Sequence, residues 1–230
     1  MGQMIEFTRP DGNTAPGYLA LPEKDAESAP GIVVVEEWWG VTAEIMRIAD
    51  DYAALGYRAL VPDLFRGRTA AVGDEANHLL EGLDFQDAYS QDVRGALQHL
   101  KQNGKKAGVT GYCIGGSVAL LAAMHLKEPD AAVIFYGFPS PEAGDPATIG
   151  IPVQCHFAKQ DEFFTPERGA EIEARMKAGK VPCEVYWYDA KHGFCNPNPP
   201  GSAGLGHHHP KAAHEAWERA VRFWKNTLHE

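Results

Sequence analysis

Hydrophobic residues along the chain form short continuous runs that alternate with longer segments at helical spacing. Residues 32–35 form a continuous β-branched run, which is typical of a strand buried on both faces. After Thr42, apolar residues recur every three or four positions as far as Gly56, so this pattern predicts a helix capped by Thr42. Further strands are predicted at residues 5–7, 17–21, 57–61, 107–110, 131–135, 153–157 and 183–188.

The remaining apolar segments have the spacing of helices. They lie at residues 85–100, 117–126 and 166–178, and a last helix is predicted to begin at Pro210. Asn103-Gly104 is expected to stop the helix over 85–100. The buried residues expected on the last helix are Ala213, Ala216, Trp217, Ala220, Val221, Trp224 and Leu228.

This alternation of strands and helices predicts a mostly parallel sheet with helices on both faces. In such a sheet the functional loops lie at the carboxyl ends of the strands. The 230 residues are enough for one α/β domain with a buried core and few for two. We therefore expect a single α/β domain over residues 1–230.

Charge and cysteine content narrow the classes of partner. The net charge of −10 disfavours a nucleic acid or an anionic membrane. No apolar stretch reaches the length of a membrane span, and the first residues carry no secretory signal. The four cysteines are irregularly spaced, which favours free thiols in a reducing cytoplasm. The sequence carries no signal for an oligomeric state.

A glycine-framed turn places Cys113 between a predicted strand and a predicted helix. Gly111-Tyr112-Cys113-Ile114-Gly115 has the spacing of a hydrolase nucleophile turn, in which the central residue is strained and its neighbours must be small. The turn lifts the sulfur to the amino end of a helix, where the helix dipole favours a thiolate. Read alone, the pentapeptide is equally compatible with a buried structural cysteine.

Two later loops contain the residues that a cysteine nucleophile needs. Asp161 follows the strand predicted at 153–157, and His192 follows the one predicted at 183–188. Their order along the chain, nucleophile then acid then histidine, is that of strand-end catalytic loops in this class of sheet. The sequence therefore predicts a Cys113–His192–Asp161 triad. The run His207-His208-His209 lacks cysteine or carboxylate partners at ligand spacing, so we expect no metal and no cofactor.

At this point the chain resembles the dienelactone hydrolase family, over nearly its whole length. The resemblance rests on residues 33–41 (VVVEEWWGV), 56–65 (GYRALVPDLF), 111–120 (GYCIGGSVAL), 157–164 (FAKQDEFF) and 190–194 (AKHGF). It implies an α/β-hydrolase fold without a large cap domain, and a carboxymethylenebutenolidase-like activity on esters or lactones. It also implies that Cys113, His192 and Asp161 act as nucleophile, base and orienting acid.

The same resemblance implies a role for Glu37, as a carboxylate against the nucleophile that helps control its proton. Its neighbour Glu36 is expected to be a solvated loop residue or to accept a hydrogen bond at the strand end. Backbone N–H groups of Ile114 and Trp38 are expected to form the oxyanion hole. The predicted reaction is acyl transfer to water through a thioester on Cys113.

The substrate-binding residues expected in this family are only partly present. No arginine follows His192 in the segment up to Asn196, and none lies in residues 69–84, so the arginines that hold a substrate carboxylate are missing there. The nearest cations are Arg66 and Arg68, which are as compatible with solvated loop charges as with a substrate contact. We expect an aromatic pocket and a more apolar substrate, with Trp38, Trp39, Phe65, Tyr136, Phe163 and Phe194 as its candidate residues.

Three alternatives remain open on the sequence. The enzyme could be a broad-specificity esterase that also acts on activated esters or phosphoesters. Cys113 could instead be a reactive thiol on a non-catalytic protein of the same fold. The acyl group could also pass to an acceptor other than water, although residues 111–116 lack the Gly-Lys-Ser/Thr ending of a phosphate loop.

Overall fold

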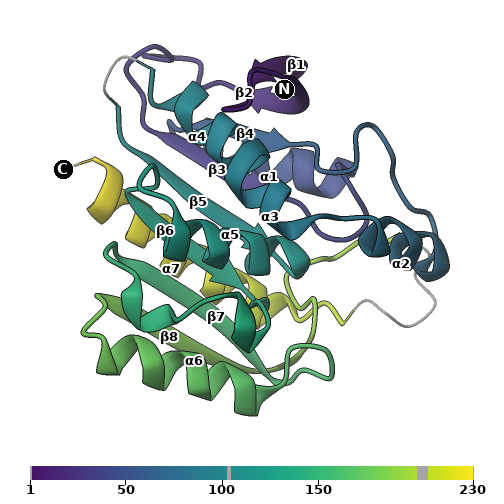
Figure 1. The fold of residues 1–230 in the computed structure, drawn as a ribbon, viewed down its shortest axis with the longest axis vertical. Coiled ribbons are helices and arrows are strands. Elements are labelled where there is room, and N and C mark those ends of the chain that lie inside the picture. The colour runs from purple at the N-terminus through teal and green to yellow at the C-terminus, as the bar shows by residue number, and fades with distance from the viewer. Residues whose placement is uncertain (1, 103–104, 201–206, 230) are drawn as a thin grey trace.

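The computed structural model describes residues 2–102, 105–200 and 207–229. Within these ranges the centre of the molecule is one eight-stranded sheet with the order β1-β2-β4-β3-β5-β6-β7-β8 (Figure 1). The strands are β1 (Gln3–Thr8), β2 (Thr14–Ala20), β3 (Gly31–Val35), β4 (Arg58–Pro62), β5 (Ala107–Tyr112), β6 (Ala131–Phe135), β7 (Val153–Gln160) and β8 (Cys183–Lys191).

The six strands from β3 to β8 run parallel to their neighbours, whereas β2 is antiparallel to both β1 and β4. This confirms the prediction of a mostly parallel sheet, and each predicted strand overlaps an observed one. The central strands β3, β5 and β6 are buried along their whole length, as their continuous apolar sequences indicate.

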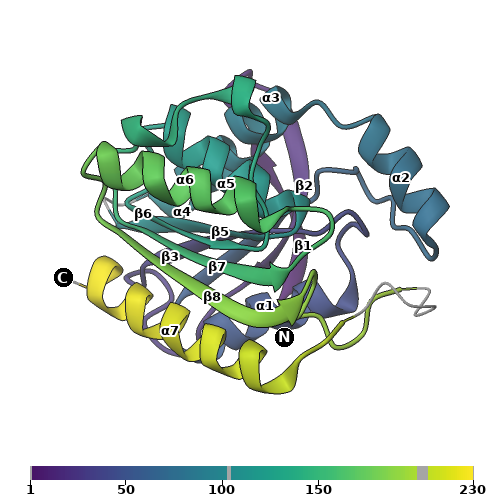
Figure 2. The ribbon, with the colours of Figure 1, turned by 90° about the horizontal axis from the view of Figure 1, so that it is seen from below.

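Helices cover both faces of the sheet, as predicted. Figure 2 shows α1 and α7 on one face and α4, α5 and α6 on the other, and each face has its own apolar core. The helices are α1 (Ala43–Ala54), α2 (Gly73–Glu81), α3 (Phe85–Asp87), the π-helical segment η1 (Ala88–Val93), α4 (Arg94–Leu100), α5 (Ile114–His125), α6 (Pro166–Ala178) and α7 (Pro210–Leu228), with 3₁₀ turns η2 (Pro141–Ala143) and η3 (Pro146–Thr148).

None of the helices in the described ranges combines the length and the apolar character that crossing a membrane requires. The residues Asn103-Gly104, which were predicted to end the helix over 85–100, lie outside the described residues.

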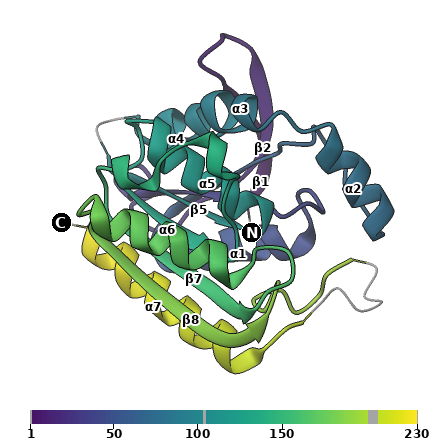
Figure 3. The same cartoon turned by 60° about the horizontal axis from the view of Figure 1, so that its bottom comes forward.

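Helix α2 is absent from the sequence-based expectations. It buries only Ala76 and Leu79, which is too little apolar periodicity to show against a polar background. Val72 precedes it without a side-chain cap, so the usual signal for a helix start is also missing. In Figure 3, α2 stands away from the two helical layers, beyond the carboxyl ends of the strands.

Two other helices differ from their predicted form. Helix α5 begins directly after Cys113 rather than at Ser117, because the glycines after the turn already have helical geometry. The helix predicted over 85–100 contains the π-helical segment η1, whose wider turn lets both Asp92 and Val93 face inward.

The buried face of α7 is rotated slightly from the predicted one. Ala216, Ala220, Trp224 and Leu228 are buried as expected, whereas Ala213, Trp217 and Val221 are only half-buried. Ala212 and Phe223 are buried in addition. The Trp224 ring packs directly against Gly108, where an added Cβ would lie 2.3 Å from Trp224 Cζ3.

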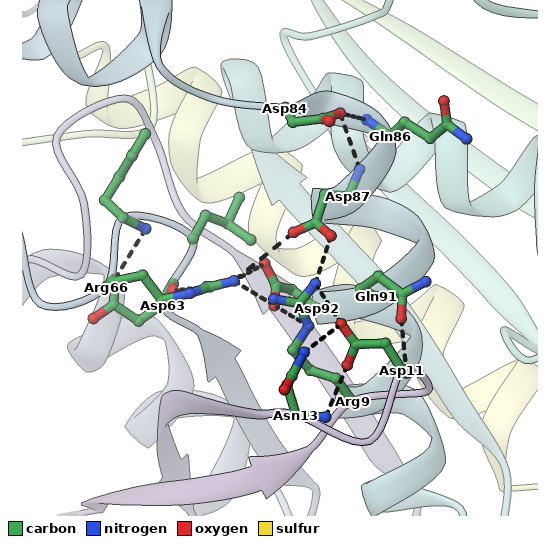
Figure 4. A network of polar contacts seen from close by, with 12 residues as sticks. Arg9, Asp11, Asn13, Asp63, Arg66, Asp84, Gln86, Asp87, Gln91 and Asp92 are labelled. Carbon is green, nitrogen blue, oxygen red and sulfur yellow. Dashed lines mark hydrogen bonds and ion pairs between the residues drawn. The ribbon is translucent and has the colours of Figure 1, made fainter.

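A buried polar network fixes the loop that follows β4 (Figure 4). Asp92, which is 2 % exposed, accepts two hydrogen bonds of 2.9 Å from Arg66 Nη2 and pairs with Arg9 Nε at 3.5 Å. Arg66 also donates to the backbone oxygen of Asp63 at 2.7 Å. The Asp92 charge is therefore balanced by two guanidinium groups, as a buried carboxylate requires.

Glu36 lies beneath this loop and is fully buried. Its Oε1 accepts a hydrogen bond from the Leu64 N–H at 3.0 Å, so the strand-end hydrogen bond is present but the solvated position is not. Burial, reinforced by the charge of Asp63, raises the pKa of Glu36 well above its usual value. The hydrogen bond to Leu64 thus ties the end of β3 to the loop after β4.

Candidate active site

Four strands of the sheet end immediately before a polar or nucleophilic residue. β3 is followed by Glu36 and Glu37, β5 by Cys113, β7 by Asp161 and β8 by His192. Because all four strands are parallel, these residues meet at one edge of the sheet, the edge at which ligands bind in open α/β sheets.

Cys113 has a strained backbone conformation, with φ 57° and ψ −122°. Positive φ is unfavourable for a residue with a side chain, and it is retained only where surrounding contacts enforce it. Here the Cys113 N–H donates to the Phe135 oxygen at 3.1 Å, and the Cys113 oxygen accepts from Gly116 N–H at 2.9 Å. The chain therefore passes from strand to helix at one residue.

The glycines around Cys113 are required by close backbone contacts. A Cβ on Gly115 would lie 2.4 Å from the backbone oxygens of Val35 and Glu36, and a Cβ on Gly111 would lie 2.0 Å from the Gly115 oxygen. A third glycine, Gly137, lies against Cys113 itself, because its Cβ would be 1.8 Å from the Cys113 oxygen. The turn is thus packed on three sides with no room for a side chain.

Cys113, His192 and Asp161 form a continuous series of contacts. His192 Nε2 lies 3.2 Å from Cys113 Sγ, and His192 Nδ1 lies 2.9 Å from Asp161 Oδ2. The other carboxylate oxygen, Oδ1, accepts hydrogen bonds of 2.9 Å from the N–H groups of Phe163 and Phe164. These two bonds orient Asp161 toward the imidazole.

The imidazole of His192 is enclosed by aromatic rings. Phe164 stacks against it at 5.5 Å between ring centroids, and Phe163 and Tyr136 meet it edge-on at 5.1 and 5.3 Å. Burial opposes its protonation, but the attraction of Cys113 and the hydrogen bond that Nδ1 donates to Asp161 outweigh burial and raise the His192 pKa to about 10. The arrangement therefore favours an imidazolium beside the sulfur.

Glu37 is held by two neighbours at the same edge. Its Oε2 accepts a hydrogen bond of 2.5 Å from Asn196 Nδ2, and its Oε1 lies 3.5 Å from the Tyr136 hydroxyl. Burial raises the pKa of the Glu37 carboxyl, and the Asn196 bond opposes that rise. The predicted neighbour of the nucleophile is therefore a carboxyl whose proton is retained more readily than that of a solvated glutamate.

A cavity of about 480 Å³ opens over these groups. Its lining includes Glu37, Trp38, Trp39, Cys113, Ile114, Phe163 and His192 from the sequence-based candidates, and Gly73, Asp74, Asn77, Leu80, Phe164, Gly193, Asn196 and Pro199 in addition. Ile114 is the first residue of α5, so its N–H has no acceptor within the helix and is free to bind a ligand oxygen. Trp38 also lines the cavity.

Five of the candidate pocket residues do not line this cavity. Phe65 and Phe194 are buried in the apolar core, and Tyr136 is buried behind Glu37. The Arg66 guanidinium donates hydrogen bonds to Asp92, and the Arg68 Nε donates to the Phe65 backbone oxygen at 3.1 Å. These positions were predicted from their place at strand ends, but their side chains lie in the core or along the loop and do not line the cavity.

The cavity residues absent from the sequence-based candidates come from the loop after β7, which holds Phe164, from the loop after β8 and from α2. Asn196 stands in the His192 loop, where the family resemblance implies an arginine and this chain has a neutral amide. Gly73, Asp74, Asn77 and Leu80 come from α2, whose weak apolar pattern hid the helix. A better reading of residues 73–81 as a helix would have placed all four on one face.

Comparisons with known proteins identify relatives over nearly the whole chain. A model of the dienelactone hydrolase family matches residues 15–228. A carboxymethylenebutenolidase from Rhodococcus opacus is 30 % identical, with 94 % of this chain and 90 % of the relative covered. "Protein usf" from Aquifex pyrophilus is also 30 % identical and covers 99 % of this chain and 100 % of its own length.

Among solved structures, a dienelactone hydrolase-like promiscuous phosphotriesterase from metagenomic libraries superimposes with a TM-score of 0.86. The two chains are 20 % identical, and the match covers 99 % of this chain and 98 % of the other. At this identity the likeness shows the fold alone, which is that of the α/β-hydrolases.

Gly115→Ala tests the packing of the turn. We expect the free energy of unfolding to fall by roughly 2–4 kcal/mol, because the new Cβ meets backbone oxygens that cannot move aside. Gly150→Ala is the matched control, since nothing lies within 4 Å of its Cβ position. That control should change stability by less than about 1 kcal/mol. Urea unfolding measures both, and equal stabilities for the two variants would contradict the packing described here.

Proposed function

The chain belongs to the dienelactone hydrolase family, and from that premise we propose that it hydrolyses carboxylic esters or lactones with Cys113 as nucleophile. One observation carries the proposal: Cys113 Sγ, His192 and Asp161 are in contact in series at a strained turn that opens into a cavity. A nucleophile in contact with a base, and a base oriented by a third group, is the arrangement that covalent acyl transfer needs.

In the first half of the proposed reaction, the Cys113 thiolate adds to the carbonyl carbon and the carbonyl electron pair moves to oxygen. The backbone N–H groups of Ile114 and Trp38 bind that oxyanion. The intermediate then collapses, the carbon–oxygen bond of the ester breaks, and the leaving oxygen takes the proton from His192 Nε2. The acyl group remains on sulfur as a thioester.

In the second half, His192 is neutral and accepts a proton from a water molecule. The resulting hydroxide adds to the thioester carbonyl, and the carbon–sulfur bond breaks to release the acid and restore the thiolate. Asp161 keeps Nδ1 of the imidazole facing away from the sulfur in both halves. A thiolate needs little base assistance for attack, which suits a leaving group that is a stabilised enolate.

Glu37 is proposed to control the proton of Cys113 before substrate binds. Its raised pKa means that it retains a proton more readily than a solvated glutamate does, and its hydrogen bond from Asn196 opposes that rise. A carboxyl that exchanges a proton with a thiol would keep the sulfur unreactive until substrate enters.

The proposal extends to the partners of the enzyme and to its cellular compartment. Its substrate is a small molecule, and the acidic chain is not expected to act on nucleic acid or at a membrane. All four cysteines are free, which supports a reducing compartment such as the cytoplasm.

Cys113→Ala tests the nucleophile on a panel of p-nitrophenyl esters, lactones including dienelactone, and one activated phosphotriester. We expect wild type to hydrolyse esters or lactones, and the variant to lose roughly a thousandfold or more in kcat/KM. Cys183→Ala, which replaces a half-buried thiol away from the cavity, is the control and should leave kcat/KM unchanged.

The same panel separates the alternatives. Hydrolysis of the phosphotriester alone would favour a phosphoesterase, and no turnover of any compound would favour a reactive-thiol protein. Product analysis with added alcohols or amines would reveal transfer to an acceptor other than water.

Asn196→Ala tests the control of Glu37. The Asn196 N–H favours the charged carboxylate, so its removal should raise the Glu37 pKa further. The limb of the pH profile of kcat/KM that reports Glu37 should then move to higher pH. In Glu37→Gln that limb should be absent, because an amide does not titrate.

Asn198→Ala is the matched control, since Asn198 is an exposed asparagine in the same loop. Its profile should superimpose on that of wild type. A profile for Asn196→Ala that also superimposes on wild type would refute the role given to Glu37.

A further inference from the structure

Helix α2 gives the cavity a wall whose polar groups attract a particular kind of substrate. Gly73, Asp74, Asn77 and Leu80 of this helix line the cavity. They share one face because Asn77 follows Gly73 by four residues and Asp74 by three, and Leu80 follows Asn77 by three. The helix is anchored from its other side by the buried Ala76 and Leu79. Asp74 and Asn77 are exposed, so they stand at the open part of the cavity.

Away from His192, whose positive charge faces Cys113 and Asp161, the charged side chains that line the cavity are acidic. Among the described residues that line it, none is a lysine or an arginine. Arg66, the nearest cation considered from the sequence, is paired with Asp92 and does not reach the cavity. The Asp161 charge faces His192, and Glu37 has a raised pKa, so Asp74 is the carboxylate left to face an incoming ligand.

From these observations, and resting on the proposed ester hydrolysis, we infer that Asp74 and Asn77 select substrates whose end far from the scissile carbonyl is cationic or carries neutral hydrogen-bond donors. A carboxylate at that end would meet Asp74 with no cation to balance it. Like charges at short range in a partly enclosed site are repelled more strongly than in open water. Ammonium, hydroxyl or amide groups would be accepted instead.

The Asn77 side chain fits the same assignment. An amide both donates and accepts hydrogen bonds, so it binds a neutral polar group without adding charge. Leu80 and the aromatic Trp38 and Phe163 supply apolar surface for the part of the chain between that group and the ester. The cavity thus fits a neutral or cationic ester with an apolar middle section.

Three p-nitrophenyl esters of equal acyl length test the inference, with the far end of the acyl chain carrying a hydroxyl, a carboxylate or a trimethylammonium group. For wild type, kcat/KM should be on the order of tenfold higher for the trimethylammonium ester than for the carboxylate ester, with the hydroxyl ester between them. Added salt should reduce the ratio, because it screens the charge of Asp74.

Variants on the cavity face of α2 should change the ratio in a defined order. The ratio is kcat/KM for the trimethylammonium ester divided by kcat/KM for the carboxylate ester. Asp74→Asn should bring this ratio close to one, Asp74→Lys should lower it below one, and Asn77→Asp should increase it. Glu81→Gln is the matched control: it removes the same charge from the same helix at a position that does not line the cavity, and should leave the wild-type ratio. Thermal unfolding confirms that each variant is folded.

The outcomes distinguish this inference from the function on which it rests. Hydrolysis of all three esters with equal kcat/KM, or equal effects of Asp74→Asn and Glu81→Gln, overturns the assignment of Asp74 alone. Hydrolysis of none of them overturns the proposed function and this inference together.

Discussion

The strained backbone of Cys113 is the constraint on which the rest of the site depends. A φ of 57° is tolerated because the Gly111, Gly115 and Gly137 backbones press against the turn from three sides. Relaxing the turn would require one of those contacts to open. Gly111 lies in β5, Gly115 lies in α5, and Gly137 lies two residues after the end of β6. Packing around the turn therefore fixes the position of the Cys113 sulfur. The loops that contain His192 and Asp161 place their side chains relative to that fixed position.

Around that fixed point the charges are arranged in two layers. Next to the sulfur, His192 and Asp161 favour an imidazolium that balances negative charge. Further out, Glu37 is held by the neutral amide of Asn196 rather than by a cation, and burial favours its protonated form. With Asp74 at the open part of the cavity, this arrangement disfavours anionic ligands. The specificity inferred above follows from the absence of lysine and arginine among the described residues of the cavity wall.

The sequence predicted the parts of the molecule that follow from strong local patterns. Continuous β-branched runs predicted the central strands. The glycine spacing around Cys113 predicted the turn, and the structure shows the close backbone contacts that require those glycines. It failed where side-chain direction decides the outcome. Phe65 and Phe194 follow strands, as pocket residues do, yet they turn into the core. Helix α2 buries too few apolar residues to be recognised, so the wall that it forms could not be predicted. The contact between Asn196 and Glu37 depends on how the loop after β8 folds, so the sequence alone did not predict it.

The central claim is that the acyl group passes through the sulfur of Cys113. Acid quenching followed by mass spectrometry of wild type and of His192→Ala, which lacks the base for thioester hydrolysis, tests it directly. After reaction with a p-nitrophenyl ester, we expect one acyl group per chain in His192→Ala, located on the peptide that contains Cys113 and absent when Cys113 is also replaced by alanine. An acyl group on any other residue, with Cys113 unmodified, would contradict the account.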